Sequence, residues 1–229
     1  MAAGQGKRMN SDLPKVLQPL GGRSILSHVL ATASALGSQS INIVYGHGGD
    51  LVRKEFESST VDWTFQAEQL GTGHALKQAL PNISKDHQIL ILFGDVPLIT
   101  EGSLKKLLKV AIKGGIALLT AELSNPEGYG RVIKNNNNQL IKIVEHKDAT
   151  NQERKVKEIN SGIYVLSSKL IIEKIPLIKN DNIQKEYYLP DIFNFTNESE
   201  TSIFKVNNPD EISGINNLEQ LKTLENIEK

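Results

Sequence analysis

The first fifteen residues of the chain combine glycines with cations in a way that suits the binding of a polyphosphate. Gly4 and Gly6 alternate with small or polar residues, so the backbone can turn tightly and present its N–H groups to an anion. Lys7, Arg8 and Lys15 add positive charge to a stretch with no apolar face to bury. The spacing is neither that of a Walker loop nor that of a dinucleotide-binding fingerprint. By itself the stretch fits a phosphate-binding loop or an ordinary surface turn.

An aspartate follows the most apolar segment of the chain and is a candidate metal ligand. Residues 88–93 are expected to form a buried strand, and Gly94 and Asp95 stand at its carboxyl end. A carboxylate in such a place is costly unless it is paired or bound to a metal. Mg²⁺ prefers oxygen ligands and often takes only one or two of them from the protein. Asp95 therefore indicates a magnesium site, with capping of the following loop as the alternative.

Three histidines invite comparison with a catalytic triad or a zinc site. The sequence neighbours of His47, His74 and His146 show neither metal-ligand spacing nor a nucleophile motif. We therefore expect these side chains to have structural or supporting roles.

The elements that would position these residues alternate between strand and helix in the first half of the chain. Apolar patterns predict strands at 41–45, 61–66, 88–93 and 116–123, with helices at 21–36, 50–56, 71–80 and 103–113. This alternation predicts an α/β fold with a doubly wound, mostly parallel, Rossmann-like sheet and a ligand crevice at the strand carboxyl ends. After residue 125 the pattern changes to β segments at 128–133, 140–144 and 159–166, which predicts a smaller β-rich lobe.

Composition narrows the class of protein. The 229 residues carry 26 basic and 26 acidic side chains, so no overall positive field favours nucleic acid or an anionic membrane. The absence of cysteine excludes disulfides and thiolate metal sites, and no apolar run approaches the roughly 20 residues of a membrane span. We expect a cytoplasmic enzyme or binding protein with no nucleic acid or membrane partner.

The order of short motifs along the whole chain resembles the sugar-1-phosphate nucleotidyltransferases. Within that group it is most similar to the uridyltransferase part of the bifunctional N-acetylglucosamine-1-phosphate uridyltransferase/glucosamine-1-phosphate acetyltransferases. The matching strings are Ala2-Ala3-Gly4-x-Gly6-x-Arg8-Met9, Leu13-Pro14-Lys15, the segments 45–49 and 66–75, Gly94-Asp95-Val96-Pro97-Leu98, Gly128-Tyr129-Gly130-Arg131, and the segments 143–148 and 158–162.

The resemblance implies the substrates UTP and N-acetylglucosamine 1-phosphate, with Mg²⁺ as cofactor. It implies catalytic roles for Arg8 and Lys15, and metal ligation by Asp95 and Asn216. The implied substrate-binding residues are Met1, Ala2, Ala3, Gly4, Lys15, Gln66, Gly71, Thr72, Phe93, Gly94, Asp95, Gly130, Glu145, Asn160 and Asn216. Of these, Gln66 and the backbone near Gly71 would pair with the uracil edge.

The same resemblance assigns the remaining polar residues to the sugar. Glu145 and Asn160 would hydrogen-bond the sugar hydroxyls, and Gly130 and Thr72 would form the floor under the sugar and its acetamido group. It also implies one domain over residues 1–229, with a nucleotide-binding half at 1–124. Residues 125–229 would be a sugar-binding lobe with a C-terminal helix, without the acetyltransferase β-helix. That domain forms the trimers of the family, so the sequence leaves the oligomeric state open.

Some features depart from the family pattern. Lys7 stands where threonine is usual, and Phe93 replaces a common tyrosine. The family also has an apolar strand immediately before the Ala2-Ala3-Gly4 loop, so we expect either further residues upstream of Met1 or a poorly stable chain. The alternatives are a nucleotidyltransferase for another sugar 1-phosphate or another nucleotide, such as glucose 1-phosphate or dTTP, or a non-catalytic nucleotide-sugar sensor.

Overall fold

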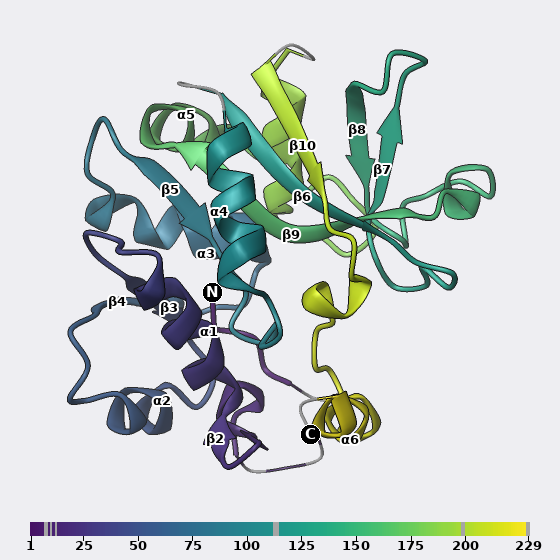
Figure 1. Cartoon of the computed structure of the whole chain (residues 1–229). Coiled ribbons are helices and arrows are strands. Elements are labelled where there is room, and N and C mark those ends of the chain that lie inside the picture. The colour runs from purple at the N-terminus through teal and green to yellow at the C-terminus, as the bar shows by residue number, and fades with distance from the viewer. Residues whose placement is uncertain (7–8, 10, 12, 112–114, 198–199, 228–229) are drawn as a thin grey trace.

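The largest sheet of the molecule is mixed and joins strands from both halves of the chain (Figure 1). The computed structural model describes residues 1–229 apart from residues 7–8, 10, 12, 112–114, 198–199 and 228–229. Within the described residues the sheet has six strands, with the order β10-β6-β9-β7-β8 and with β5 also paired to β9. These strands are β5 (Gln88–Ile91), β6 (Ile116–Glu122), β7 (Arg131–Lys134), β8 (Leu140–Val144), β9 (Glu158–Ser167) and β10 (Thr201–Lys205).

The alternation of strands and helices up to β6 confirms the α/β, Rossmann-like class, whereas the directions of the strands correct the expectation of a mostly parallel sheet. β10 runs parallel to β6, whereas β9 runs antiparallel to β5, β6 and β7. The reason lies in the segment after β6, which forms the antiparallel β7–β8 hairpin and then returns in the opposite direction. The returning strand, β9, takes the place between β5 and β6.

A second, parallel pair of strands is joined to the large sheet through the first residues of the chain. β3 (Asn42–Tyr45) pairs with β4 (Asp62–Phe65), and the backbone N–H of Ala2 donates to the carbonyl of Val44 at 2.7 Å. On the other side, the amine of Met1 donates to Leu92 O at 2.6 Å, and Gly94 N donates to Met1 O at 2.9 Å. Residues 1–3 therefore lie between β3 and the end of β5.

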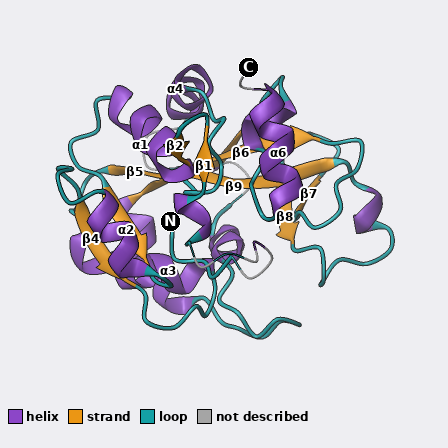
Figure 2. Cartoon of the chain, turned by 90° about the horizontal axis from the view of Figure 1, so that it is seen from below, coloured by secondary structure: helices purple, strands orange, loops and turns teal. Residues whose placement is uncertain are grey.

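Both faces of the central strand β6 are buried under helices (Figure 2). Ile116 and Leu118 belong to one apolar cluster with residues of α3 and α5, and Leu119 belongs to another with residues of α4. The helices are α1 (Ile25–Ala35), α2 (Gly49–Glu55), α3 (Thr72–Ala79), α4 (Glu101–Val110), α5 (Ser168–Lys174) and α6 (Leu218–Ile227). β1 (Pro19–Leu20) and β2 (Arg23–Ser24) form a hairpin before α1. None of the described helices has the length and apolar character needed to cross a membrane.

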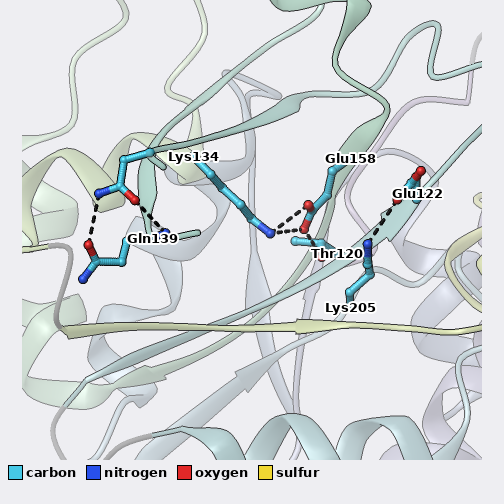
Figure 3. Close-up of polar contacts among 7 residues, drawn as sticks. Thr120, Glu122, Lys134, Gln139, Glu158 and Lys205 are labelled. Carbon is cyan, nitrogen blue, oxygen red and sulfur yellow. Dashed lines mark hydrogen bonds and ion pairs between the residues drawn. The ribbon is translucent and has the colours of Figure 1, made fainter. Parts of the chain in front are cut away.

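Ionic contacts cross-link the strands on the side of the sheet shown in Figure 3. Glu158 on β9 accepts two hydrogen bonds from the ammonium of Lys134 on β7, at 2.6 and 2.7 Å, and one from the hydroxyl of Thr120 on β6, at 2.7 Å. A more exposed pair, Lys205 and Glu122, connects β10 to β6 at 3.1 Å. Because the first pair is largely shielded from water, we expect it to contribute more to the register of the strands.

Candidate active site

A cavity of about 540 Å³ opens where the N-terminal loop, the segment after β4 and the end of β5 meet. We call it the central cavity. The residues expected from the sequence that line it are Met1, Ala2, Ala3, Gly4, Lys15, Gln66, Gly71, Thr72, Phe93 and Asp95. Residues that the sequence reasoning missed also line it, namely Gln5, Val16, Gln69, Ala75 and Glu186. The fold thus brings together segments that are up to 185 positions apart in the chain, from Met1 to Glu186.

Three residues from distant segments converge at one side of this cavity. The ammonium of Lys15 lies 2.5 Å from Asp95 Oδ2 and 3.2 Å from Asn216 Oδ1. Lys15 follows Pro14 at the start of a short 3₁₀ helix, and Asp95 lies in the turn after β5. The side chains of Lys15 and Asp95 are only 13% and 18% exposed, so the pair is shielded from bulk water. The arrangement presents two oxygen atoms that can bind a cation, together with one positive charge from Lys15.

Gln66 closes another side of the cavity, directly after β4. Its backbone N–H donates to Tyr45 O at 2.8 Å, which continues the β3–β4 pairing by one residue. Its side chain is 3% exposed, and the amide nitrogen lies 3.2 Å from Gly71 O and 3.0 Å from His74 Nδ1.

Gly71 is the N-cap of helix α3, and its position has no room for a side chain. Its φ is +110°, and a Cβ there would lie 2.6 Å from Tyr187 O. The next residue, Thr72, accepts a hydrogen bond from Leu189 N at 3.0 Å through its hydroxyl. The segment that leads into α3 is therefore fixed against residues 187–189.

Gly130, Glu145 and Asn160 form a second group beside the cavity and do not line it directly. A Cβ on Gly130 would lie 3.1 Å from Glu145 Oε1 and 3.5 Å from Asn160 Cβ. Phe93, which lines the cavity, packs so closely on Gly162 that a Cβ there would lie 2.5 Å from the ring. Gly162 in turn donates its N–H to Asn160 Oδ1 at 3.0 Å, which connects Phe93 to this group through one residue.

The carboxyl of Glu145 lies in an unusually acidic environment. Burial first, and then the carboxylates of Asp148, Asp191 and Glu186, raise the pKa of Glu145 to about 7 against an opposing effect of Arg131. Burial and the charge of Asp148 also raise the pKa of Asp191, to about 6. The Glu145 carboxyl is therefore partly protonated at neutral pH and can act as a hydrogen-bond donor.

Sequence reasoning could have found only part of this acidic group. Asp148 lies three residues after Glu145 in the same matched motif, so the sequence already indicated that these two carboxylates are close together. Asp191 comes from a 3₁₀ helix (Leu189–Phe195) after β9, and no motif pointed to it.

The remaining expected residues have less direct positions. Gly94 supports the first segment through its hydrogen bond to Met1 O, and a Cβ there would lie 3.2 Å from Ala2 Cβ. Arg8, expected to be catalytic, and Lys7 lie outside the described residues. Within the described part of the chain, no three His, Cys, Asp or Glu side chains gather as ligands for a metal ion. The oxygens of Asp95 and Asn216 would be a two-ligand site that needs further oxygens from a ligand or water.

Comparison with known families identifies the group to which the chain belongs. The model of the family described as "MobA-like NTP transferase domain" matches residues 1–157, which is more than half of the sequence. The chain belongs to this family. The match is to an NTP transferase domain in general, so it is coarser than the uridyltransferase resemblance of the motifs.

Solved structures share the fold of this NTP transferase domain over the entire chain. HddC from Yersinia pseudotuberculosis complexed with GMP-PN has a TM-score of 0.73 at 21% identity and covers 100% of this chain and 97% of its own. A putative glucose-1-phosphate thymidylyltransferase from Bacillus anthracis in complex with a sucrose has a TM-score of 0.73 at 20% identity, covering 99% and 92%. A second HddC structure has a TM-score of 0.71 at 20% identity, covering 99% and 95%.

Proposed function

We propose that this chain transfers UMP from UTP to N-acetyl-α-D-glucosamine 1-phosphate, giving UDP-N-acetylglucosamine and pyrophosphate for the synthesis of cell-wall precursors. The observation that carries the proposal is the convergence of Lys15, Asp95 and Asn216 at a cavity lined by the N-terminal glycine loop. Membership of an NTP transferase family supports the reaction class. The order of motifs from the N-terminal loop to Gly162 supports the choice of nucleotide and sugar.

The chemistry needs alignment and neutralisation of charge more than proton transfer. An oxygen of the sugar 1-phosphate forms a bond to the α-phosphorus of UTP, and the bond from that phosphorus to the oxygen that bridges to the β-phosphate breaks. Pyrophosphate leaves with the electron pair. The attacking phosphate oxygen is already nucleophilic, so no general base is required. Lys15 and the N–H groups of the glycine loop would stabilise charge on the phosphates, and Arg8 would act on the leaving pyrophosphate.

The donor set at the cavity fits a magnesium ion. Asp95 Oδ2 and Asn216 Oδ1 are hard oxygen ligands that meet at the same ammonium, so both face one cation position. When bound there, Mg²⁺ would neutralise phosphate oxygens and align them for displacement. Lys15 would then be free to turn from Asp95 towards the phosphates.

The group beside Phe93 has hydrogen-bonding capacity suited to a sugar. Asn160 Oδ1 accepts from Tyr164 OH at 2.9 Å and from Gly162 N at 3.0 Å, so the amide nitrogen of Asn160 is left to donate to a hydroxyl. The partly protonated Glu145 can both donate and accept. Gly130 keeps the space between them open, since a Cβ there would press against Glu145.

Another pair of substrates is the strongest alternative. The thymidylyltransferase named among the structural neighbours suggests glucose 1-phosphate and dTTP as the pair to compare. A non-catalytic sensor is less well supported, because binding alone does not need Lys15, Asp95 and Asn216 together at a metal position.

The decisive experiment is pyrophosphate release from each nucleotide with each sugar 1-phosphate. We expect the highest kcat/KM for UTP with N-acetylglucosamine 1-phosphate, and a lower value with glucosamine 1-phosphate. A pocket that hydrogen-bonds the acetamido group leaves buried partners unpaired when that group is missing. Equal values for the two sugars would refute the choice of sugar, and no turnover with any pair would favour the sensor. No acetyl transfer from acetyl-CoA should be detectable.

The metal role is tested in the same assay. We expect turnover to require Mg²⁺, and Asp95→Ala to lose most activity while its circular dichroism spectrum and melting behaviour remain those of a folded protein. Unchanged pyrophosphate release by Asp95→Ala in the presence of EDTA would contradict the assignment of Asp95 as a metal ligand.

A further inference from the structure

The side-chain amide of Gln66 is held in one orientation by two groups of the protein. Its nitrogen lies 3.2 Å from Gly71 O and 3.0 Å from His74 Nδ1. A carbonyl oxygen can only accept a hydrogen bond, so the Gln66 atom that faces Gly71 must be the amide nitrogen and not the oxygen. Both amide hydrogens are thereby used inside the protein, and the side chain is 3% exposed.

In this orientation the side-chain oxygen of Gln66, Oε1, is available to accept a hydrogen bond from a ligand. Among the described residues Gln66 Oε1 has no hydrogen-bond donor, and Gln66 lines the central cavity. A ligand that enters beside Gln66 therefore meets a carbonyl-type oxygen. A ring N–H pairs well with such an oxygen, whereas an unprotonated ring nitrogen would face it acceptor to acceptor.

His74 keeps the amide in this orientation through its own protonation pattern. Nδ1 accepts from Gln66, so a neutral ring carries its hydrogen on Nε2. Nε2 lies 3.1 Å from Gln78 Nε2, one turn further along α3, so a hydrogen on His74 Nε2 requires the Gln78 amide to be turned with its oxygen, the acceptor, towards the ring. The ring also lies beside Tyr187, with 6.1 Å between the ring centroids.

We propose that His74 is a positioning residue that sets nucleobase specificity by fixing Gln66 with Oε1 as the recognition atom. The site then favours bases with a ring N–H at the Watson–Crick edge, which are uracil, thymine and guanine. It disfavours cytosine and adenine, whose corresponding ring nitrogen is an acceptor. The inference rests on the proposed function, because it takes the central cavity to be a nucleotide site.

The test is the binding of UTP and CTP by calorimetry, without sugar phosphate, so that no turnover occurs. Wild-type protein should bind UTP more tightly than CTP by at least about tenfold, the scale of one well-placed hydrogen bond. His74→Phe removes the acceptor at Nδ1 and keeps a flat ring, so the ratio of the two affinities should fall about tenfold. His74→Asn restores an acceptor near the Nδ1 position and should keep the ratio within about threefold of the wild-type value.

Controls separate specificity from folding. Lys77→Ala, an exposed change on the same helix, should leave the ratio unchanged. If His74→Phe does not fold, Gln78→Leu serves instead: it removes the partner of Nε2, and the ratio should fall by about threefold or more. With saturating UTP, kcat of His74→Phe should stay near the wild-type value while KM rises.

Each contrary result has a distinct meaning. An unchanged ratio in the folded His74 or Gln78 variant would overturn the role of His74 but leave the proposed function standing. Equal weakening of UTP and CTP without rescue by asparagine would show a merely structural role and would also overturn it. Failure of wild-type protein to bind any nucleotide would overturn the proposed function together with this inference.

Discussion

At the scale of single residues, the position of Lys15 is the most informative feature. Its ammonium lies 2.5 Å from Asp95 Oδ2 and 3.2 Å from Asn216 Oδ1, the two oxygens that we propose as metal ligands. The sequence indicated a cation at this point of the chain. It could not show that this cation contacts the two proposed metal ligands, because that contact joins positions 15, 95 and 216.

We expect Lys15→Ala to slow the chemical step by about 2–4 kcal/mol, the scale for removing one preorganised charged contact. Single-turnover rates of pyrophosphate release at saturating substrates measure this loss. Arg8→Ala should behave similarly, and the exposed change Lys54→Ala should not. A wild-type kcat with only a raised KM would instead show that Lys15 contributes uniform substrate binding.

From the raised pKa of Glu145 we predict that the stability of the folded protein depends on pH. Its pKa in the folded protein is about 7, above the value of 4.5 for an unperturbed glutamate, because burial and then Asp148, Asp191 and Glu186 disfavour its charge. The folded state therefore binds the proton more tightly than the unfolded state. The contribution to stability is complete below about pH 4.5 and is lost as the pH rises through 7.

The comparison to make is the free energy of unfolding of Glu145→Gln and wild type between pH 4.5 and 8. We expect the difference to shift by about 1–3 kcal/mol in favour of the variant as the pH rises. Glu153→Gln provides a control, because hydrogen bonds from Lys142 and Thr150 lower the pKa of Glu153 to about 2, so its contribution is lost only as the pH falls below about 4.5 and the difference should change little between pH 4.5 and 8. A difference that does not change with pH would contradict the assignment of a raised pKa to Glu145.

At the scale of elements, local patterns located most helices and strands but not the pairing of the strands. β3, β6 and β8 lie close to their predicted ranges because their apolar runs and flanking glycines or polar residues are local features. The placement of β9 was not predictable in this way. Its sequence is apolar on both faces, which fits any interior position in a sheet, and the direction depends on the preceding hairpin.

For the candidate site, too, local sequence patterns predicted some of the residues and the tertiary fold determined the others. The glycine loop, Gln66 and Asp95 carried recognisable motifs, and the structure places them around one cavity. No sequence motif pointed to Glu186, which lines the cavity from an irregular segment after α5. Which residues share a cavity is decided by the tertiary fold, not by patterns along the chain.

The two lysine–glutamate contacts of the sheet allow a matched test of burial. We expect Lys134→Met to reduce the free energy of unfolding by about 2–4 kcal/mol, because it leaves the carboxylate of Glu158 shielded and without its cation. Lys205→Met removes a pair whose side chains are 48% and 58% exposed and should cost about 0–1 kcal/mol. Urea titrations of both variants measure the difference. Equal losses would show that burial of the Lys134 pair has no energetic consequence.

At the scale of the whole molecule, the two halves of the chain share one core. Tyr164 and Leu166 of β9 belong to the same apolar cluster as Ala75 and Leu76 of α3. Ile163 and Val165 of β9 belong to the cluster of α4. The half expected to bind the nucleotide therefore buries its helices partly against a strand of the half expected to bind the sugar. The boundary expected near residue 124 remains a prediction about function, and the strands on either side of it are hydrogen-bonded to one another.

The position of β9 has a consequence for the order in which the protein can be made. During synthesis β5 and β6 leave the ribosome first, but the strand that lies between them ends at residue 167. Until then neither strand has its central partner, and long-range pairing of this kind is slow to form. We expect a nascent chain of 124 residues to remain protease-sensitive and one of about 205 residues to become resistant, as arrested ribosome complexes would show. Protease resistance already at 124 residues would mean that β5 and β6 form other stable contacts before β9 is synthesised.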